Sequence, residues 1–408
     1  MTKEYQYNHL IIYLIIYFFF NSFLLPQGLL YITILTPVMA YFLFKEKKLR
    51  KVYIWAIALI IPIPFQLLSG VELQSFMVSN IMVITALVFL ITAYYFIKKY
   101  KYLIDIVFRK ILIINTFFVV LAIIILPFAS IRDLLWYDVA LTKGLELIPR
   151  LKLFTYEASY YSLIMMPVFL YFIMRVFYDK EKHPMLVFLA SVIPLLLSFS
   201  FGVLGALLIA LLISVIIFWT KIPGSLQKFS ILSTTFLIIL FVLLFFIWPE
   251  NPIYFRLENI FEGQDTSAMG RLVYSFMFAK DIIIEHGVIF GIGPGQIKIV
   301  AHDMIVNYYE YHGTLETVVR IPNSMAEMLA IYGVYGFVFK LFLEIYFFIK
   351  LRIYSNLYAL VLFLFILIYQ FTGSFITNIA ELGIWAIVFG VRFIDFDTLP
   401  YQRKLDSV

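Results

Sequence analysis

Residues 201–220 read FGVLGALLIALLISVIIFWT, twenty residues without a charged side chain. A helix of this length rises about 30 Å, which matches the thickness of the hydrocarbon core of a bilayer. Similar apolar runs recur along the 408 residues, of which 63% are hydrophobic and 14% charged, and the mean hydropathy is +0.97. A soluble domain of this composition would expose too much apolar surface. The sequence therefore predicts an all-α polytopic integral membrane protein.

The apolar runs predict about twelve transmembrane helices. They lie near residues 10–25, 28–44, 52–68, 76–97, 111–130, 158–178, 185–199, 201–220, 229–248, 325–347, 356–372 and 375–394. We read the first run as a helix and not as a signal peptide, because it lacks a small-residue cleavage site and further spans follow it. The whole chain, 1–408, is predicted to be one membrane domain.

Basic residues set the predicted orientation, because cytoplasmic loops of membrane proteins carry an excess of Lys and Arg. They follow the second, fourth, sixth, eighth and tenth spans: Lys45, Lys47, Lys48, Arg50, Lys51, Lys98, Lys99, Lys101, Arg109, Lys110, Arg175, Lys180, Lys182, Lys221, Lys228, Lys350 and Arg352. Both termini are then predicted to be cytoplasmic. The net charge of +6 is a topology signal and not a sign of nucleic-acid binding. The chain has no cysteine, which excludes disulfides and a cysteine nucleophile.

The largest segment between spans is residues 249–324, predicted to be an extracytoplasmic loop with short helices that belongs to the same domain. Within it, DTSAMGRLVYSFMFAKDIIIEHG (265–287) predicts an amphipathic helix that Thr266 or Ser267 caps and Gly287 ends. GIGPGQ (291–296) predicts a tight turn. We do not interpret it as a nucleotide-binding loop, since no strand precedes it.

This loop also collects ionisable residues: His286, His302, His312, Arg256, Arg271 and Arg320. Arginines beside a bilayer offer planar, permanently charged donors for phosphate. Histidines can accept a proton from a hydroxyl near neutral pH. For any single residue a solvated loop is an equal explanation, and His286 at a helix end is favoured by the helix dipole.

The stretch RIPNSMAEMLAIYGVYGF (320–337) places polar residues at the mouth of the tenth span, where they are costly. Asn323 or Ser324 can cap the helix, which explains Asn323 but not Arg320. Glu327 lies one turn inside, where it can orient Arg320 or bind a glycan. Glu381, near the outer end of the last span, either lines a glycan cavity or bonds to a neighbouring helix.

Two further charges, Lys340 and Glu344, fall in the predicted cytoplasmic half of the tenth span at helical spacing i, i+4. We predict that they form an internal ion pair. They lie on the wrong side for chemistry at the outer leaflet.

Four stretches resemble the O-antigen and exopolysaccharide polymerases, in the same order along the chain. They are YEASYYS (156–162), LLSFSFGVLGALLIALL (196–212), GRLVYSFMFAKDIIIEHGVIFGIGPGQ (270–296) and residues 320–337. The O-antigen ligases share the pattern, usually with a His-Asn pair. Here Pro322 precedes Asn323, which favours the polymerases, and Ala158 replaces the proline usual in the family.

The resemblance implies an enzyme at the outer leaflet of a bacterial cytoplasmic (inner) membrane. Its donor is a glycan on a polyprenyl diphosphate such as undecaprenyl diphosphate, and its acceptor is another lipid-linked repeat unit. The acceptor hydroxyl attacks the anomeric carbon, and polyprenyl diphosphate leaves. The product is the O-antigen of lipopolysaccharide or an exopolysaccharide. Implied partners are the bilayer and a chain-length regulator and flippase of the same pathway, with no cofactor and no nucleic acid.

The resemblance and the residue chemistry assign roles in this glycosyltransferase. The bases are Glu157 and His312, the diphosphate ligands are Arg271, Arg320 and Arg256, and the glycan ligands are Asn323, Glu327 and Glu381. Arginines can stabilise the leaving charge, so we expect no metal. The helix dipole alone would equally favour Glu157. A ligase would differ only in its acceptor. A flippase or transporter is less favoured, because the largest loop comes late and the halves do not resemble each other.

Overall fold

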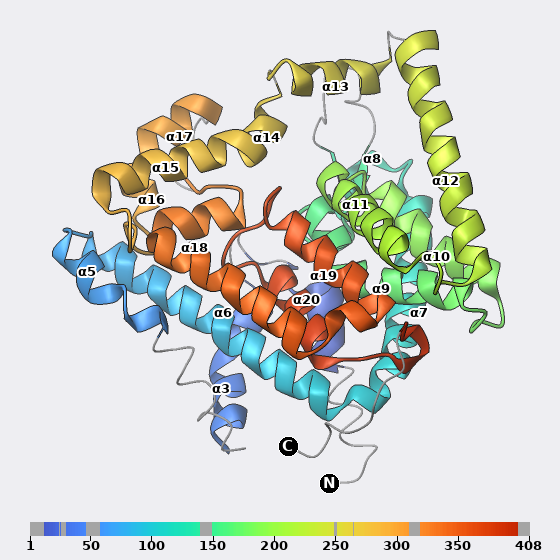
Figure 1. The fold of residues 1–408 in the computed structure, drawn as a ribbon, viewed down its shortest axis with the longest axis horizontal. Helices are drawn as coiled ribbons and strands as arrows, with labels where there is room; N and C mark the ends of the chain where they lie inside the picture. Colours follow the sequence, from blue (N-terminus) through green and yellow to red (C-terminus); the bar gives the residue numbers. More distant parts are fainter. Residues whose placement is uncertain are drawn as a thin grey trace.

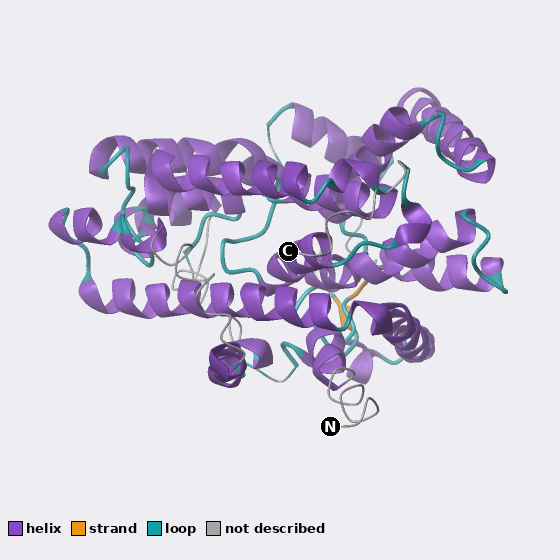
Figure 2. Ribbon diagram, turned by 60° about the horizontal axis from the view of Figure 1, so that its bottom comes forward, coloured by secondary structure: helices purple, strands orange, loops and turns teal. Residues whose placement is uncertain are grey.

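The computed structural model describes residues 12–23, 25, 30–45, 58–138, 149–248, 251–263, 265–309 and 319–398. Regular structure in these ranges is almost entirely helical (Figure 2). The exception is a two-stranded antiparallel sheet, in which β1 (Trp136–Tyr137) pairs with β2 (Arg150–Leu151). The predicted all-α class agrees with this architecture.

In these ranges five helices are long and apolar enough to cross a membrane. They are α6 (Leu73–Lys99), α7 (Ile104–Ile125, with η3, Lys101–Leu103), α9 (Ala158–Phe177), α11 (Phe201–Phe218) and α18 (Ser324–Lys350). Shorter apolar helices are the Ala58–Leu68 stretch with α5 (Ile63–Leu68), α10 (Pro184–Leu197), α19 (Leu357–Tyr369) and α20 (Ile379–Gly390). Further helical segments are η1 (Ile16–Phe20), α2 (Tyr31–Ile34), α3 (Thr36–Lys45), α12 (Gly224–Val242) and η4 (Leu243–Ile247). The count of twelve spans stays a prediction.

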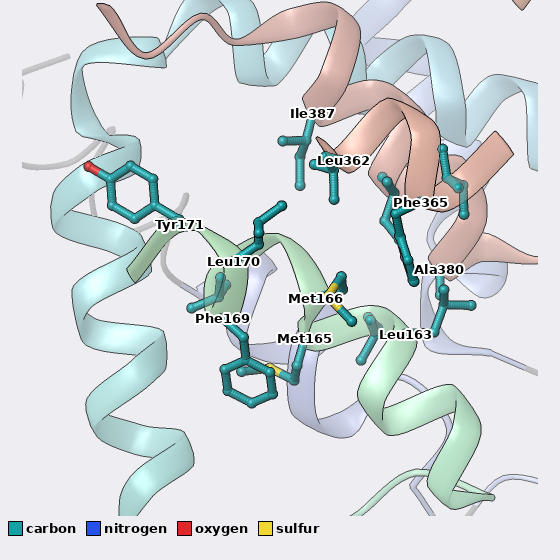
Figure 3. Close-up of a cluster of buried hydrophobic side chains, with 14 of the residues drawn as sticks. Leu163, Met165, Met166, Phe169, Leu170, Tyr171, Leu362, Phe365, Ala380 and Ile387 are labelled. Atoms are coloured by element: carbon teal, nitrogen blue, oxygen red, sulfur yellow. The ribbon is translucent and has the colours of Figure 1, made fainter. Parts of the chain in front are cut away.

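Helix α9 lies at the centre of the bundle. Of its most apolar window, 78% is buried, as expected for a helix that is apolar on all sides. It packs against α7, α10, α19 and α20. Figure 3 shows Leu163, Met166 and Leu170 of α9 in the same buried cluster as Phe365 of α19 and Ile387 of α20. This core holds the start of α9 next to the end of α19 and the start of α20.

Residues 251–309 form short helices on one side of the bundle (Figure 1). They are α13 (Pro252–Phe261), α14 (Thr266–Met269), η5 (Gly270–Tyr274), α15 (Ser275–His286), α16 (Ile297–Val300) and α17 (His302–Tyr309). A second hydrophobic cluster joins them to α18 through Phe278, Ile282, Ile305, Ala330 and Tyr332. The segment thus shares a core with the bundle.

The predicted amphipathic helix over 265–287 is present but interrupted, because η5 is a π-helical turn between α14 and α15. The predicted caps were wrong. Asp265 stands before the helix, and its Oδ1 accepts the Ala268 N–H at 2.9 Å. Gly287 ends the helix as predicted, with a φ of 149°.

Helix α18 is broken at Gly333, where φ is 65° and ψ is −164°. We call residues 324–332 the first limb and residues 334–350 the second limb. The backbone groups at the break bond to residues 288–293: Ile292 N–H to Ala330 O (3.1 Å), Gly293 N–H to Ile331 O (2.9 Å), Val334 N–H to Val288 O (3.0 Å) and Tyr335 N–H to Ile289 O (3.0 Å). The predicted tight turn therefore supports the break.

The two limbs fold back on each other. Nζ of Lys340 lies 2.9 Å from Oγ of Ser324, although sixteen residues separate them. In a straight helix that separation is about 24 Å. The expectation that Lys340 lies far from the outer end of the helix was therefore wrong, because the break at Gly333 returns the second limb past the start of the first.

Candidate functional site

Asn323 caps the first limb and ties it to two other segments. Its Oδ1 accepts the N–H groups of Met325 (3.1 Å) and Ala326 (2.9 Å). Its Nδ2 donates to the carbonyls of Arg271 (2.8 Å) and Phe371 (2.6 Å). The residue is fully buried. The predicted cap is confirmed, and the amide has both of its donors and its oxygen in use within the protein.

Arg320 is held by an ion pair with Glu327. Nε and Nη2 of Arg320 lie 2.9 and 2.7 Å from Oε1 of Glu327, and the guanidinium packs 4.1 Å from the ring centre of Phe375. Glu327 is 2% exposed, and its Oε2 accepts the Ile376 N–H at 2.7 Å. Glu327 therefore orients Arg320, one of the two roles we considered for it. Within the described ranges, Nη1 of Arg320 has no hydrogen-bond partner.

Arg271 lies in η5. Its carbonyl is bound by Asn323, which brings the residue to the start of the first limb. The side chain is half-buried, and it makes no ion pair with any residue that the structure describes. π-helical turns inside α-helices occur frequently at functional sites. Arg271 is thus a cation held in place by its backbone, and no residue of the described ranges forms an ion pair with its guanidinium.

Two tyrosines connect the predicted site residues. The hydroxyls of Tyr156 and Tyr369 interact electrostatically, and Glu157 acts on both. Arg320 acts on Tyr156, whereas Arg271 acts on Tyr369. The structure therefore gathers both arginines and Glu157 around one pair of phenols, although they come from three separate stretches of sequence.

Glu157 stands at the N-cap position of α9, but its carboxylate does not bond to the helix backbone. It accepts a hydrogen bond from the Ser159 hydroxyl and is half-buried. Side-chain capping does not explain this residue, and its role as a base stays a prediction.

The remaining candidates contribute less to this constellation. His312 lies outside the described residues. Arg256 belongs to α13, which stands apart from the bundle (Figure 1), and its side chain is not described. His286 ends α15 beside Glu285, and His302 begins α17 beside Asp303.

Sequence reasoning missed a buried charge cluster beside the cap. Lys340 Nζ lies 3.1 Å from Oε1 of Glu381 and 4.0 Å from Oε1 of Glu344. Oε2 of Glu381 accepts the Ser374 hydroxyl at 2.6 Å. Glu381 thus bonds to a neighbouring helix, which was one of its two predicted roles. The predicted pair of Lys340 with Glu344 is present, but it is longer than the pair with Glu381.

The signal that could have found this cluster is the GVYG sequence at 333–336. A glycine inside a helical pattern lowers the helix propensity and marks a break or a close packing contact. At Gly333 it does both, and the break explains why Lys340 reaches Ser324 and why Glu344 reaches Gln370.

Comparison of the chain with protein-family models finds no match, and comparison with curated proteins finds none either. The interpretation of the site therefore rests on its geometry and on the sequence motifs.

Proposed function

We propose that this protein is a membrane glycosyltransferase that joins polyprenyl-diphosphate-linked glycan repeat units into a polymer. The observation that carries the proposal is the junction at Asn323. One buried amide ties the backbone of Arg271 to the helix start, three residues after Arg320. Among the residues that the structure describes, none forms an ion pair with Arg271 and none bonds to Nη1 of Arg320, while Glu327 fixes the orientation of Arg320.

This arrangement suits the transfer chemistry. When polyprenyl diphosphate leaves, negative charge grows on its bridging oxygen, and preorganised cations stabilise that charge more than the ground state. An arginine clamped by a buried carboxylate loses little conformational freedom on binding phosphate. Tyr156 lies within electrostatic reach of Arg320 and of its neighbour Glu157, and we propose that the acceptor hydroxyl approaches on this side.

Two other functions use the same features. A ligase would transfer the finished glycan to a different acceptor, and Pro322 in place of the usual histidine weighs against it. A flippase would use the cations to carry the diphosphate without breaking a bond. The fixed orientation of Arg320 favours bond cleavage over transport, because a carrier must move together with the group that it holds and then release it.

The direct test uses purified protein in vesicles with a lipid-linked repeat unit as both donor and acceptor. We expect a ladder of lipid-linked polymer and release of polyprenyl diphosphate, and both should persist in excess chelator. If the unit is only moved across the bilayer, or is transferred only to a different acceptor lipid, the polymerase assignment is wrong.

Substitutions of Arg271 and Arg320 test whether these residues take part in the reaction. Arg271→Ala should lower the rate by about two to three orders of magnitude, the usual cost of removing a transition-state donor. Arg320→Ala alone would leave Glu327 as a buried unpaired charge, so we pair it with Glu327→Gln. The double variant should fold and be as slow as Arg271→Ala, whereas Glu327→Gln alone should retain more activity.

The matched control is Arg352→Ala, an exposed arginine at the end of the second limb. It should leave polymer formation unchanged. Near-normal rates in Arg271→Ala and in the Arg320→Ala/Glu327→Gln variant would remove both arginines from the site.

A further inference from the structure

A line of hydrogen bonds runs from the loop after α19 into the bundle. Asn378 Nδ2 donates to Ser374 Oγ at 2.9 Å, and the Ser374 hydroxyl donates to Glu381 Oε2 at 2.6 Å. The other oxygen of Glu381 meets Lys340 Nζ at 3.1 Å. Lys340 also donates to Ser324, at the start of the first limb. The line thus connects the loop 373–378 to the helix that Asn323 caps.

Ser374 begins this line in a strained conformation. Its φ is 71°, in the left-handed region that side chains other than glycine rarely occupy. The preceding carbonyl, of Gly373, accepts the Ser324 N–H at 3.2 Å, which holds the loop against the first limb. Strain of this kind costs about 1–3 kcal/mol and clusters at active sites, where the surrounding structure enforces it.

The cluster contains more negative than positive charge. Two carboxylates, Glu381 and Glu344, share one ammonium group, Lys340. Oε1 of Glu344 and Oε1 of Gln370 are buried and have no hydrogen-bond partner in the part of the chain that the structure describes, while Gln370 Nε2 donates to the other Glu344 oxygen at 2.9 Å. Arg271 and Glu157 are further charges on this side of the bundle, because they act with Glu381 on the Tyr369 hydroxyl. The cluster can therefore accept one proton and approach neutrality.

We propose that Ser374 and Glu381 form the relay that receives the proton of the acceptor hydroxyl, with Lys340 and Glu344 as the charged groups that position Glu381. This inference rests on the proposed glycosyl transfer. The acceptor O–H bond breaks as its oxygen bonds to the anomeric carbon. That proton passes to Oγ of Ser374, whose own proton moves to Oε2 of Glu381. The bond from the anomeric carbon to the diphosphate breaks, and polyprenyl diphosphate leaves with the electron pair.

The relay has a signature that needs no substrate. Infrared difference spectra of the purified protein, recorded as the pH is lowered, should show a protonated carboxyl band that changes in both Glu381→Gln and Glu344→Gln. Spectra in which neither substitution changes a carboxyl band would overturn the proposal, whatever the protein does to lipid-linked glycans.

Kinetics with a lipid-linked donor provide the second readout. Ser374→Gly removes the hydroxyl and relieves the positive φ, so it should fold at least as well as the native chain. We expect it and Glu381→Gln to lose activity by about two orders of magnitude or more, the usual effect of general base catalysis. Glu344→Gln removes a like charge from beside Glu381, and should move the acid limb of the kcat/KM profile to lower pH.

The outcomes separate the two proposals. If the native protein forms polymer and Ser374→Gly is within about threefold of it, the relay is wrong and the transfer stands. If the native protein makes no polymer, both the proposed transfer and the proposed relay are wrong. If Glu344→Gln lowers the rate but leaves the acid limb of the kcat/KM profile at the same pH, the cluster is only structural. That result would also overturn the relay.

Discussion

Asn323 shows how one side chain can serve several segments. Aspartate and asparagine are equally good helix caps, because both offer an oxygen to the first free N–H groups. Only asparagine can also donate to the carbonyls of Arg271 and Phe371. A capping signal was readable from the sequence, whereas the two carbonyl partners were not, since they lie 52 and 48 residues away.

Replacing Asn323 with aspartate separates these roles. The cap survives, but a carboxylate would face two buried carbonyl oxygens. Each unsatisfied buried group costs about 1–3 kcal/mol. We therefore expect Asn323→Asp to lower the midpoint of thermal unfolding in detergent more than Asn323→Ser does, because serine also caps but adds no negative charge. Equal midpoints would show that the carbonyl bonds contribute little.

At the scale of helices, the break in α18 determines where the polar residues lie. Hydropathy identifies an apolar run but does not show whether the helix breaks within it. The sequence therefore predicted a single straight span over 325–347. The helix end at Gly287 and the start at Ser324 were predictable, because caps are local. The break depends on a close contact with the turn at 291–295, which is formed only in the folded chain.

Gly333→Ala tests the importance of that contact. A Cβ atom built there would lie 2.3 Å from Ile289 O and 2.7 Å from Gly291 N, and the φ of 65° would be strained. We expect little folded protein by size-exclusion chromatography in detergent. Gly205→Ala in α11 is the control, because no atom lies within 4 Å of its Cβ and alanine favours a helix by about 1 kcal/mol. A folded, active Gly333→Ala would mean that α18 does not need the break.

The link between α9 and α10 contains a buried carboxylate that two arginines bind. The side chain of Glu181 is 3% exposed. It accepts two 2.9 Å hydrogen bonds from Arg109 and a further hydrogen bond from Arg175. Burial alone would raise the pKa of the Glu181 carboxyl, but the two arginines outweigh it and hold that pKa below its usual value.

Because the folded pKa is depressed, the stabilisation is present above the unfolded pKa and is lost as the pH falls through the folded one. Glu181→Gln should therefore lower the unfolding midpoint at neutral pH, and the difference from the native chain should shrink in acid. Thermal unfolding of both proteins across a pH series measures this. A gap that stays constant down to acidic pH would exclude the ion pairs as its cause.

For the whole molecule, composition was enough to predict a helical membrane protein, and the long helices agree with it. The convergence of Arg271, Arg320 and Glu157 was beyond the sequence, because it depends on how α9, α18 and α19 pack. Orientation in the membrane was predicted from loop charges alone.

The orientation can be tested directly, since the chain has no cysteine of its own. Cysteine in place of Asp303, whose side chain is 95% exposed, should react with an impermeant maleimide in intact cells. Cysteine in place of Lys221, which is also exposed, should react only after the cells are opened. The reverse pattern would invert the predicted topology, and labelling of both sites would refute it.

The first limb of α18 is fastened at both ends to the continuous segment of η5, α15 and the turn that follows α15. The Asn323 amide joins them at one end, and the backbone bonds of residues 288–293 join them at the other. The helices also pack along their length. They should therefore move as one rigid unit, and a bound diphosphate that displaced Arg271 would also displace Arg320. Any opening of the site must then occur at the borders of this rigid unit, at Pro322 and in the loop 370–378, and not between its two helices.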